Sequence, residues 1–246
     1  MCADVIAVTG SASGIGAAVA SSLRAIGHEV IGVDLRDAEV CADLSAVDGR
    51  KAAVSGVLER SGELDGLVVC AGVGPHVPDP MMIVEVNYRG AIAVLDGLFP
   101  ALRGAAVAVS SSASTMTKWA ENPISRGEEA AALAEAGQYA GHLAYSWSKN
   151  ALTVAVRQRV SQWGAAGVRL NTVAPGAVDT PLLQAGLGSR FGDAIRNYRA
   201  PISRHGRPDE IASLIRYLLG PDAGYIHGAQ FLIDGGSDAL LRPTEF

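Results

Sequence analysis

The chain has 246 residues, 49% apolar and 18% charged, so it can bury the core of one large α/β domain and is not a disordered tail. Its net charge of −5 argues against nucleic acid or an anionic membrane as the main partner, because both favour a basic surface. Cys2, Cys41 and Cys70 are an odd number of cysteines without a close pair, which predicts free thiols and neither a disulfide framework nor a metal site. No apolar run approaches the ~20 residues of a membrane span, and no signal-peptide pattern opens the chain, so we expect a cytoplasmic protein.

Short apolar runs alternate with longer helical patterns along the chain. Strands are predicted at residues 4–9, 29–34, near Val40, and at 67–70, 105–111, 168–174 and 230–233. Helices are predicted at residues 14–26, 47–60, 81–102, 145–163 and 210–219. Strands that are apolar on both faces and alternate with helices are typical of a parallel sheet covered on both sides. The sequence therefore predicts a single α/β domain over residues 1–246, with a Rossmann-like doubly wound parallel sheet.

Two segments interrupt this alternation. Residues 114–143 form an insert between the fifth strand and the helix after it, and they contain Met116, Trp119 and a short helical pattern near 128–136. Residues 180–206 are punctuated by glycine and lie between a strand and the last helix. Long excursions from a compact domain often form lids or binding loops, so we expect the second segment to be a substrate lid.

A glycine-rich turn joins the first strand to the first helix. Its residues are Gly10, Ser13, Gly14, Ile15 and Gly16. Glycines allow a tight turn and a close approach to a pyrophosphate, and the helix N-terminus offers free N–H groups and a positive dipole end to that anion. The spacing G-x-x-x-G-x-G differs from the common G-x-G-x-x-G, but its place directly after the first strand favours a dinucleotide site.

Asp34 ends the second strand, where a carboxylate can accept hydrogen bonds from the ribose hydroxyls of an adenosine and repel a 2′-phosphate. This favours NAD over NADP. Arg36 favours NADP instead, because an arginine can pair with the 2′-phosphate. We give Asp34 more weight, since the position directly after it is occupied by the uncharged Leu35.

Further along the chain, Asp43 and Leu44 follow the short third strand and can flank the adenine. Small residues follow the fourth strand and would let a ribose lie against the backbone. They are Cys70, Ala71, Gly72 and Val73.

Tyr145 and Lys149 lie four positions apart in YSWSK, which places them on one face of a helix. A free phenol with a pKa of about 10 is a poor base near neutrality. A nearby ammonium and the positive nicotinamide of NAD⁺ favour the phenolate, which can take a proton from an alcohol as hydride leaves. The same pattern also occurs on ordinary helix surfaces, but here the apolar ALTVAV continues the helix into a core.

A run of three serines ends the fifth strand, and ligands in an open parallel sheet lie beyond the carboxyl ends of strands. A hydroxyl there can hydrogen-bond a substrate oxygen. Asn87 lies in a predicted helix, where its propensity is poor. It can hold a kink and a water that relays protons to Lys149, or it can be a capping or core residue.

Together these motifs resemble the short-chain dehydrogenase/reductase family over essentially the whole chain. The matching elements are TGSASGIG, the strand-end Asp34, Asp43-Leu44, CAGVG, Asn87, the strand-five serine, YSWSK and PGAVDT. The resemblance implies a catalytic tetrad of Asn87, Ser111, Tyr145 and Lys149, with Ser112 as the alternative serine. It also implies that Pro175, Gly176, Val178 and Thr180 hold the nicotinamide carboxamide. Cys70 replaces the customary asparagine, which puts a side-chain role at that position in doubt.

Further shared features are GVDLRDAEV, SKNALTVAVR, TPLLQAGL and the long insert before Tyr145. In these the chain is similar, within the family, to bacterial 3α-hydroxysteroid dehydrogenase/carbonyl reductases. The similarity implies NAD(H) as cofactor and a bulky apolar ketone or secondary alcohol as substrate. An aryl or coniferyl-type alcohol dehydrogenase is the alternative, and a non-catalytic dinucleotide sensor is a more remote one. Enoyl reductases space their tyrosine and lysine more widely than YSWSK. The expected uncharged substrate walls are Val73, Met116, Trp119, Leu182, Leu183 and Leu187.

The insert also carries an expectation about assembly. Tyr145 follows Ser111 by 34 positions, much more than is usual in the family. We expect the helix in the insert to lie over the helices at 81–102 and 145–163, whose faces otherwise pair two subunits. A homodimer through the last helix and strand, at 210–219 and 230–233, is therefore predicted.

Overall fold

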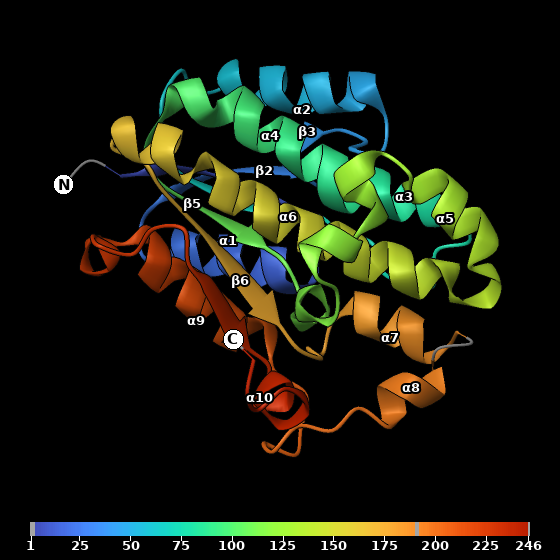
Figure 1. Ribbon diagram of the computed structural model, residues 1–246. Coiled ribbons are helices and arrows are strands. Elements are labelled where there is room, and N and C mark those ends of the chain that lie inside the picture. The colour runs from blue at the N-terminus through green and yellow to red at the C-terminus, as the bar shows by residue number, and fades with distance from the viewer. Residues whose placement is uncertain (1–2, 190–191, 246) are drawn as a thin grey trace.

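In the computed structural model, which describes residues 3–189 and 192–245, the chain folds around a seven-stranded parallel sheet (Figure 1). Cys2 lies outside the described residues. The spatial order of the strands is β3-β2-β1-β4-β5-β6-β7. Their bounds are β1 Val5–Thr9, β2 Glu29–Asp34, β3 Val40–Cys41, β4 Leu64–Val69, β5 Leu102–Val109, β6 Arg169–Pro175 and β7 Gln230–Ile233. The strand order reverses at β1 and β4, which creates a crevice at the carboxyl ends of these strands.

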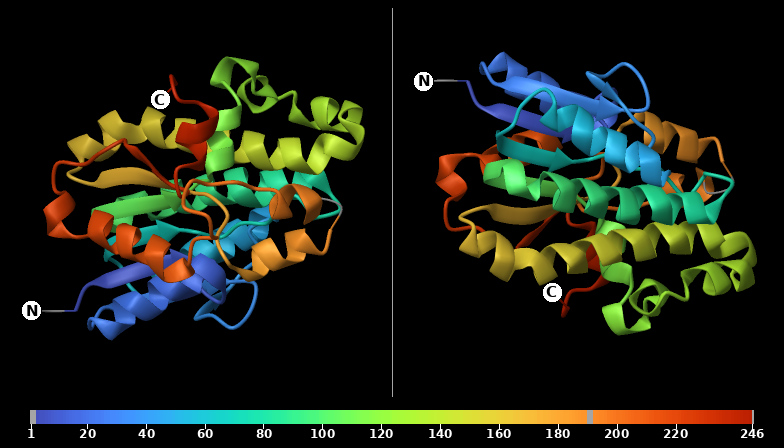
Figure 2. Two further views of the ribbon diagram at one scale, coloured as in Figure 1. Left: turned by 90° about the horizontal axis from the view of Figure 1, so that it is seen from below. Right: turned by 90° about the horizontal axis from the view of Figure 1, so that it is seen from above.

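Helices cover both faces of the sheet (Figures 1 and 2). On one face lie α1 (Gly14–Ala25) and α9 (Pro208–Leu219), and on the other lie α2 (Val47–Leu58), α4 (Ala91–Leu98) and α6 (Ala140–Ala165). The inner strands are apolar on both faces: Ile6 and Val8 pack toward α1 and α9, and Ala7 packs into the core on the opposite face. The predicted Rossmann-like doubly wound sheet is thus confirmed.

The predicted helix at 81–102 is divided in the structure. It consists of α3 (Pro80–Val84), the π-helix η1 (Glu85–Gly90), α4 and the 3-10 turn η2 (Phe99–Ala101). Strand β5 begins at Leu102, three residues before the prediction, because Pro100 lacks an N–H and ends the helix. The strand ends at Val109, two residues before the predicted end, so Ser111 lies in the loop after the strand and is not its last residue.

The helix that carries Tyr145 starts five residues earlier than predicted, at Ala140. Ala140, Ala144 and Trp147 pack into a third apolar cluster with Ile83 and Leu133, and this contact extends the helix toward the N-terminus. Tyr145 and Lys149 therefore lie inside α6 and not at its start. Their backbone N–H groups are therefore bonded to the preceding turn of the helix.

The insert consists of short helical turns around one α-helix. They are η3 (Ser112–Met116), η4 (Trp119–Glu121), η5 (Pro123–Arg126), α5 (Glu129–Glu135) and η6 (Gly137–Tyr139). Helix α5 contacts both α3 and α6, and Figure 2 shows the insert beside the N-terminal end of α6. The expectation that the insert lies over these two helices is thus confirmed only at one end of each, for α3 and for the N-terminal part of α6.

The predicted lid contains α7 (Pro181–Leu187) and α8 (Gly192–Arg196). A β-bridge between Val178 and Gly206 closes its base. The chain ends with η7 (Pro221–Ala223) before β7 and α10 (Ser237–Leu241) after it. No helix in the described part of the chain is long and apolar enough to cross a membrane.

Candidate active site

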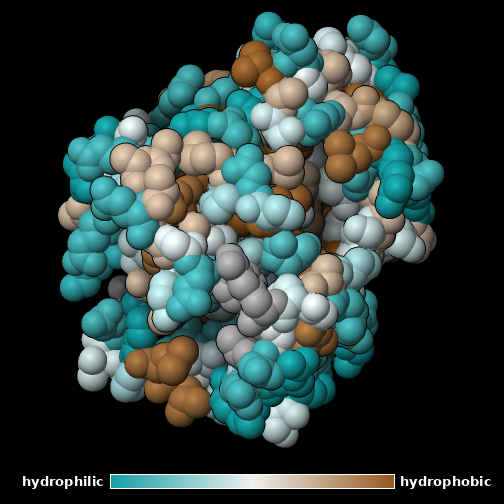
Figure 3. Space-filling view, turned by 90° about the vertical axis from the view of Figure 1, so that its right-hand side faces the viewer, coloured by the Kyte–Doolittle hydropathy of each residue, from teal (hydrophilic) through white to brown (hydrophobic). Residues whose placement is uncertain are grey.

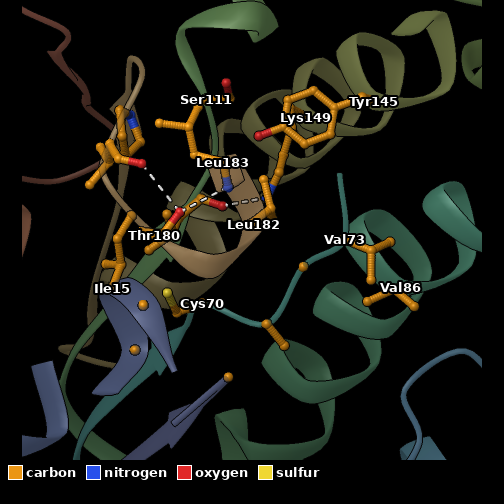
Figure 4. Close-up of a pocket in the computed structure, with 18 of the residues that line it drawn as sticks. Ile15, Cys70, Val73, Val86, Ser111, Tyr145, Lys149, Thr180, Leu182 and Leu183 are labelled. Atoms are coloured by element: carbon orange, nitrogen blue, oxygen red, sulfur yellow. Dashed lines mark hydrogen bonds between the residues drawn. The ribbon is translucent and has the colours of Figure 1, made fainter. Parts of the chain in front are cut away.

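A cavity of about 450 Å³ opens at the carboxyl ends of the central strands, at the point where the strand order reverses (Figure 4). It is continuous from the glycine-rich turn to the helix that carries Tyr145. The predicted residues that line it are Gly10, Ser13, Gly14, Ile15, Gly16, Asp34, Leu35, Asp43, Leu44, Cys70, Ala71, Gly72, Val73, Ser111, Tyr145, Lys149, Pro175, Gly176, Val178, Thr180 and Leu182. The fold thus brings together nearly all residues that the motifs pointed to.

The three glycines of the glycine-rich turn occupy positions that disfavour a side chain. Gly10 has φ +72° and Gly14 has φ +54°, in the region that favours glycine. A Cβ on Gly16 would lie 2.0 Å from the Gly10 carbonyl oxygen. Ser13 precedes α1 without capping it through its side chain, so the first-turn N–H groups of α1 are available to an anion in the cavity.

Asp34 lies at the end of β2 with its carboxylate held by the backbone. Its Oδ2 accepts a hydrogen bond from the Ala12 N–H at 3.0 Å, and its Oδ1 accepts one from the Leu35 N–H at 2.7 Å. The Arg36 side chain is 89% exposed, faces Asp37 at 4.0 Å and does not line the cavity. The nearest charge at this end of the cavity is therefore negative.

Asn87 lies behind the cavity wall and does not line it. It is fully buried in the π-helix η1, which is the local irregularity that its poor helix propensity suggested. Its Oδ1 accepts from the Val73 N–H at 2.8 Å and its Nδ2 donates to the Val73 carbonyl at 2.9 Å. The Asn87 amide thus fixes the backbone of the loop that follows β4.

Ser111, Tyr145 and Lys149 converge on one side of the cavity (Figure 4). The Ser111 hydroxyl is close enough to the Tyr145 phenol to act against the rise in the pKa of that phenol. Lys149 Nζ lies 6.0 Å from the centroid of the Tyr145 ring and donates to the Val109 carbonyl at 2.9 Å. In contrast, the Ser110 hydroxyl donates to the Lys149 carbonyl at 2.9 Å, and the phenol next to Ser112 is that of Tyr198. The surroundings of Ser111 therefore agree best with a role beside Tyr145.

Burial controls the protonation of this group. It lowers the pKa of Lys149 to about 8, and it raises the pKa of Tyr145 above its ordinary value, against the effect of the Ser111 hydrogen bond. Without a cofactor, burial therefore favours the neutral phenol. The expected shift toward the phenolate depends on the positive nicotinamide of NAD⁺ as well as on the ammonium, and it stays a prediction. Burial also raises the pKa of Cys70 to about 12, so its thiol is neutral at physiological pH.

The substrate walls agree only in part with the predicted set. Val73, Leu182 and Leu183 line the cavity, whereas Met116, Trp119 and Leu187 do not. Met116 is 61% exposed and lines a separate hollow beside the chain's C-terminal segment. For Met116 and Trp119 the reason is that the insert packs against α3 and α6 and does not fold over the cavity.

Sequence reasoning missed several lining residues. They are Pro75, Val86, His142, Ile195 and Tyr198. His142 lies three positions before Tyr145 on the same helix, and that spacing was the available signal. Tyr198 reaches the site only through the lid, where its hydroxyl donates to the Asp234 carbonyl at 3.2 Å.

The rest of the described chain offers no competing metal chemistry, since no group of three or more His, Cys, Asp or Glu side chains in it can hold a metal ion. Cys41 and Cys70 are free thiols.

Viewed from the right-hand side of Figure 1, the molecular surface shows hydrophobic residues in a recess among hydrophilic ones (Figure 3).

Comparison with known proteins agrees with this geometry. Residues 10–238 match a family described as enoyl-(acyl carrier protein) reductase. The chain is 51% identical to 3-alpha-hydroxysteroid dehydrogenase/carbonyl reductase of Comamonas testosteroni, over 99% of this chain and all of that protein. It is 31% identical to coniferyl-alcohol dehydrogenase of a Pseudomonas species, with 94% and 95% of the two chains covered.

Among solved structures, the 3-alpha-hydroxysteroid dehydrogenase from Pseudomonas sp. B-0831, complexed with NADH, superposes with a TM-score of 0.91. The two chains are 48% identical, and the match covers 98% of this chain and 100% of that one. The chain belongs to the short-chain dehydrogenase/reductase family.

Proposed function

We propose that the protein is an NAD(H)-dependent oxidoreductase that interconverts a bulky apolar secondary alcohol and its ketone, with a 3α-hydroxysteroid or an aromatic or polycyclic carbonyl as substrate. The observation that carries this proposal is the continuous cavity, which joins the glycine-rich turn and Asp34 to Ser111, Tyr145 and Lys149. The 51% identity to a 3-alpha-hydroxysteroid dehydrogenase/carbonyl reductase and the resemblance to an NADH-complexed structure support it.

The residues around the cavity fit a dinucleotide. The free N–H groups at the start of α1 would bind its pyrophosphate, and the Asp34 carboxylate would accept hydrogen bonds from its adenosine ribose. Pro175, Gly176, Val178 and Thr180 line the opposite part of the cavity, where they would hold the carboxamide. When bound, NAD(H) supplies or accepts the hydride.

Tyr145 carries the proton in this proposal. With its pKa raised by burial, its phenol is protonated in the protein alone and can donate to a ketone oxygen. Ser111 holds the substrate oxygen next to that phenol. In the direction of alcohol oxidation, the Lys149 ammonium must act together with the positive charge of the oxidised cofactor to favour the phenolate, because Lys149 by itself does not outweigh desolvation.

Apolar side chains form the substrate part of the cavity. They are Val73, Val86, Leu182, Leu183 and Ile195, from the loop after β4, from η1 and from the lid. Contact with a large ring system buries apolar area worth ~25 cal/mol per Å², which suits weakly polar substrates. Polar contacts are confined to the reacting end and to His142 and Tyr198.

The test is a side-by-side assay of NADH formation with 3α-hydroxysteroids, coniferyl alcohol and short polar alcohols. We expect kcat/KM to be highest for a hydroxysteroid. Coniferyl alcohol as the best substrate would instead favour the second candidate, an aryl alcohol dehydrogenase, which the 31% identity to coniferyl-alcohol dehydrogenase supports. Preference for short polar alcohols would refute an apolar pocket.

We also propose that the protein is a cytoplasmic homodimer. Strand β7 is an edge strand with an unpaired side, and exposed apolar residues lie on or near it and α9, namely Tyr217, Tyr225 and Leu232. Helix α5 packs on α3 and on the N-terminal part of α6, where we expect it to obstruct the other subunit contact. The free thiols of Cys41 and Cys70 favour a reducing compartment.

A further inference from the structure

A chain of charged side chains connects the insert to the body of the protein. We call it the Arg89 network, and its members are Arg50, Glu85, Arg89 and Glu129. Arg89 contacts the carboxylates of both Glu85 and Glu129. The Glu129 side chain is 5% exposed, and its second oxygen Oε2 is buried without a hydrogen-bond partner in the described structure. Arg89 is therefore what compensates the buried Glu129 charge.

The other end of the network reaches the adenosine end of the cavity. Glu85 accepts a hydrogen bond from Arg50 at 2.5 Å. The Arg50 guanidinium also donates to the backbone carbonyls of Leu44 at 2.8 Å and Ser45 at 3.0 Å. Because Leu44 lines the cavity, the network spans from the insert to a wall of the proposed cofactor site.

The middle of the network lies on the π-helix η1, which carries Asn87. Glu85 is the first residue of η1 and Arg89 the fifth. A Cβ on Gly72 would lie 3.1 Å from Asn87 Oδ1 and 3.4 Å from Lys149 Nζ, so these two side chains approach the same point of the loop after β4. Wider π-turns are rare and depend on surrounding contacts, which the two ion pairs of Arg89 provide here.

We propose that Arg89 and Glu129 are positioning residues, through which the insert holds the Asn87-bearing turn in register with Val73 and Lys149. This inference rests on the proposed function. It gives the insert a role in catalysis, although Met116 and Trp119, the substrate walls expected in it, do not line the cavity. Neither Arg89 nor Glu129 lines the cavity, so an effect on turnover has to pass either through η1, which carries Arg89, or through α6, on which α5 packs. The state of Asn87 distinguishes the two routes.

The test compares Glu129→Gln, which removes the buried charge at constant size, with the wild type. We expect kcat to fall about tenfold or more and KM for the alcohol to change less than about threefold, because misplacement affects the reacting geometry more than substrate contact. Glu128→Gln is the matched control: Glu128 is the neighbouring acid, paired with Arg126 and 58% exposed, and its loss should leave kcat unchanged.

A second readout does not depend on activity. The Val73 N–H donates to Asn87 Oδ1, so its hydrogen exchange should be about tenfold faster in Glu129→Gln and unchanged in Glu128→Gln. If either kcat or Val73 exchange stays at the wild-type level, the proposal is overturned. If Glu129→Gln does not fold, Arg89→Lys, which keeps the charge but loses the two-sided contact, is measured in the same way. Should the wild type lack NAD-dependent turnover, the proposed function fails, and the exchange rates alone decide whether the network holds Asn87.

Discussion

The Lys149 ammonium is expected to destabilise the fold in which it acts. Lys149 is 4% exposed, and burial lowers its pKa from 10.5 to about 8, against a small opposing effect of Cys70. At about 1.4 kcal/mol per pH unit, this difference corresponds to about 3 kcal/mol of unfavourable free energy when the lysine is charged. Lys149→Met removes the charge at similar volume, but it leaves the Val109 carbonyl without its donor, which costs about 1 kcal/mol.

We therefore expect Lys149→Met to raise the free energy of unfolding by about 2 kcal/mol at pH 7 while abolishing turnover. Below pH 8 the lysine is protonated in both the folded and the unfolded states, so the penalty is fully present. Between pH 8 and 10.5 the unfolded chain retains a proton that the folded protein has released, so the contribution of Lys149 to wild-type stability becomes less unfavourable as pH rises. The advantage of the variant should accordingly shrink between pH 7 and pH 10.

Urea unfolding at several pH values measures the difference in the free energy of unfolding between Lys149→Met and the wild type. The dependence of that free energy on urea concentration should be equal for the two proteins. Lys51→Met is the matched control, because Lys51 is 73% exposed beside Asp48 and its loss should change stability by less than about 0.5 kcal/mol. A Lys149→Met protein less stable than the wild type at pH 7 would show that the ammonium is well compensated in the fold, and the reasoning would then be refuted.

Three further predictions concern the site and the assembly. Wild-type kcat/KM should favour NAD⁺ over NADP⁺ by about 100-fold or more, because the Asp34 carboxylate and a 2′-phosphate ~4 Å away would repel by about 4 kcal/mol at an effective dielectric of ~20. Asp34→Asn should reduce the ratio of the two kcat/KM values. Equal use of both cofactors by the wild type would contradict this prediction. Tyr145→Phe should reduce turnover by ~10²–10⁴ and retain NADH binding in a fluorescence titration, whereas near-normal turnover would exclude Tyr145 as the proton carrier. Light scattering should give twice the subunit mass of 25.3 kDa, and a stable tetramer would count against the proposed dimer.

The features that the sequence determined by itself depend on spacing along the chain. Alternating apolar runs predicted the parallel sheet, because a strand buried on both faces must be apolar throughout. Gly10, Gly14 and Gly16 predicted the turn after β1, and the separation of Tyr145 and Lys149 placed them on one helix face. These are local rules, and they hold whatever the distant segments do.

Only the tertiary structure decided which side chains meet. Met116 and Trp119 were plausible walls by their apolar character, but the insert packs on α3 and α6, away from the cavity. The resemblance already implied Ser111, but only the fold shows that Ser110 faces the Lys149 carbonyl and that Ser111 lies near Tyr145. The pairing of Arg89 with Glu129 joins residues 40 positions apart. The physical reason is that burial and ion pairing arise between segments distant in sequence. Burial likewise raises the pKa of Tyr145, which its spacing from Lys149 does not reveal.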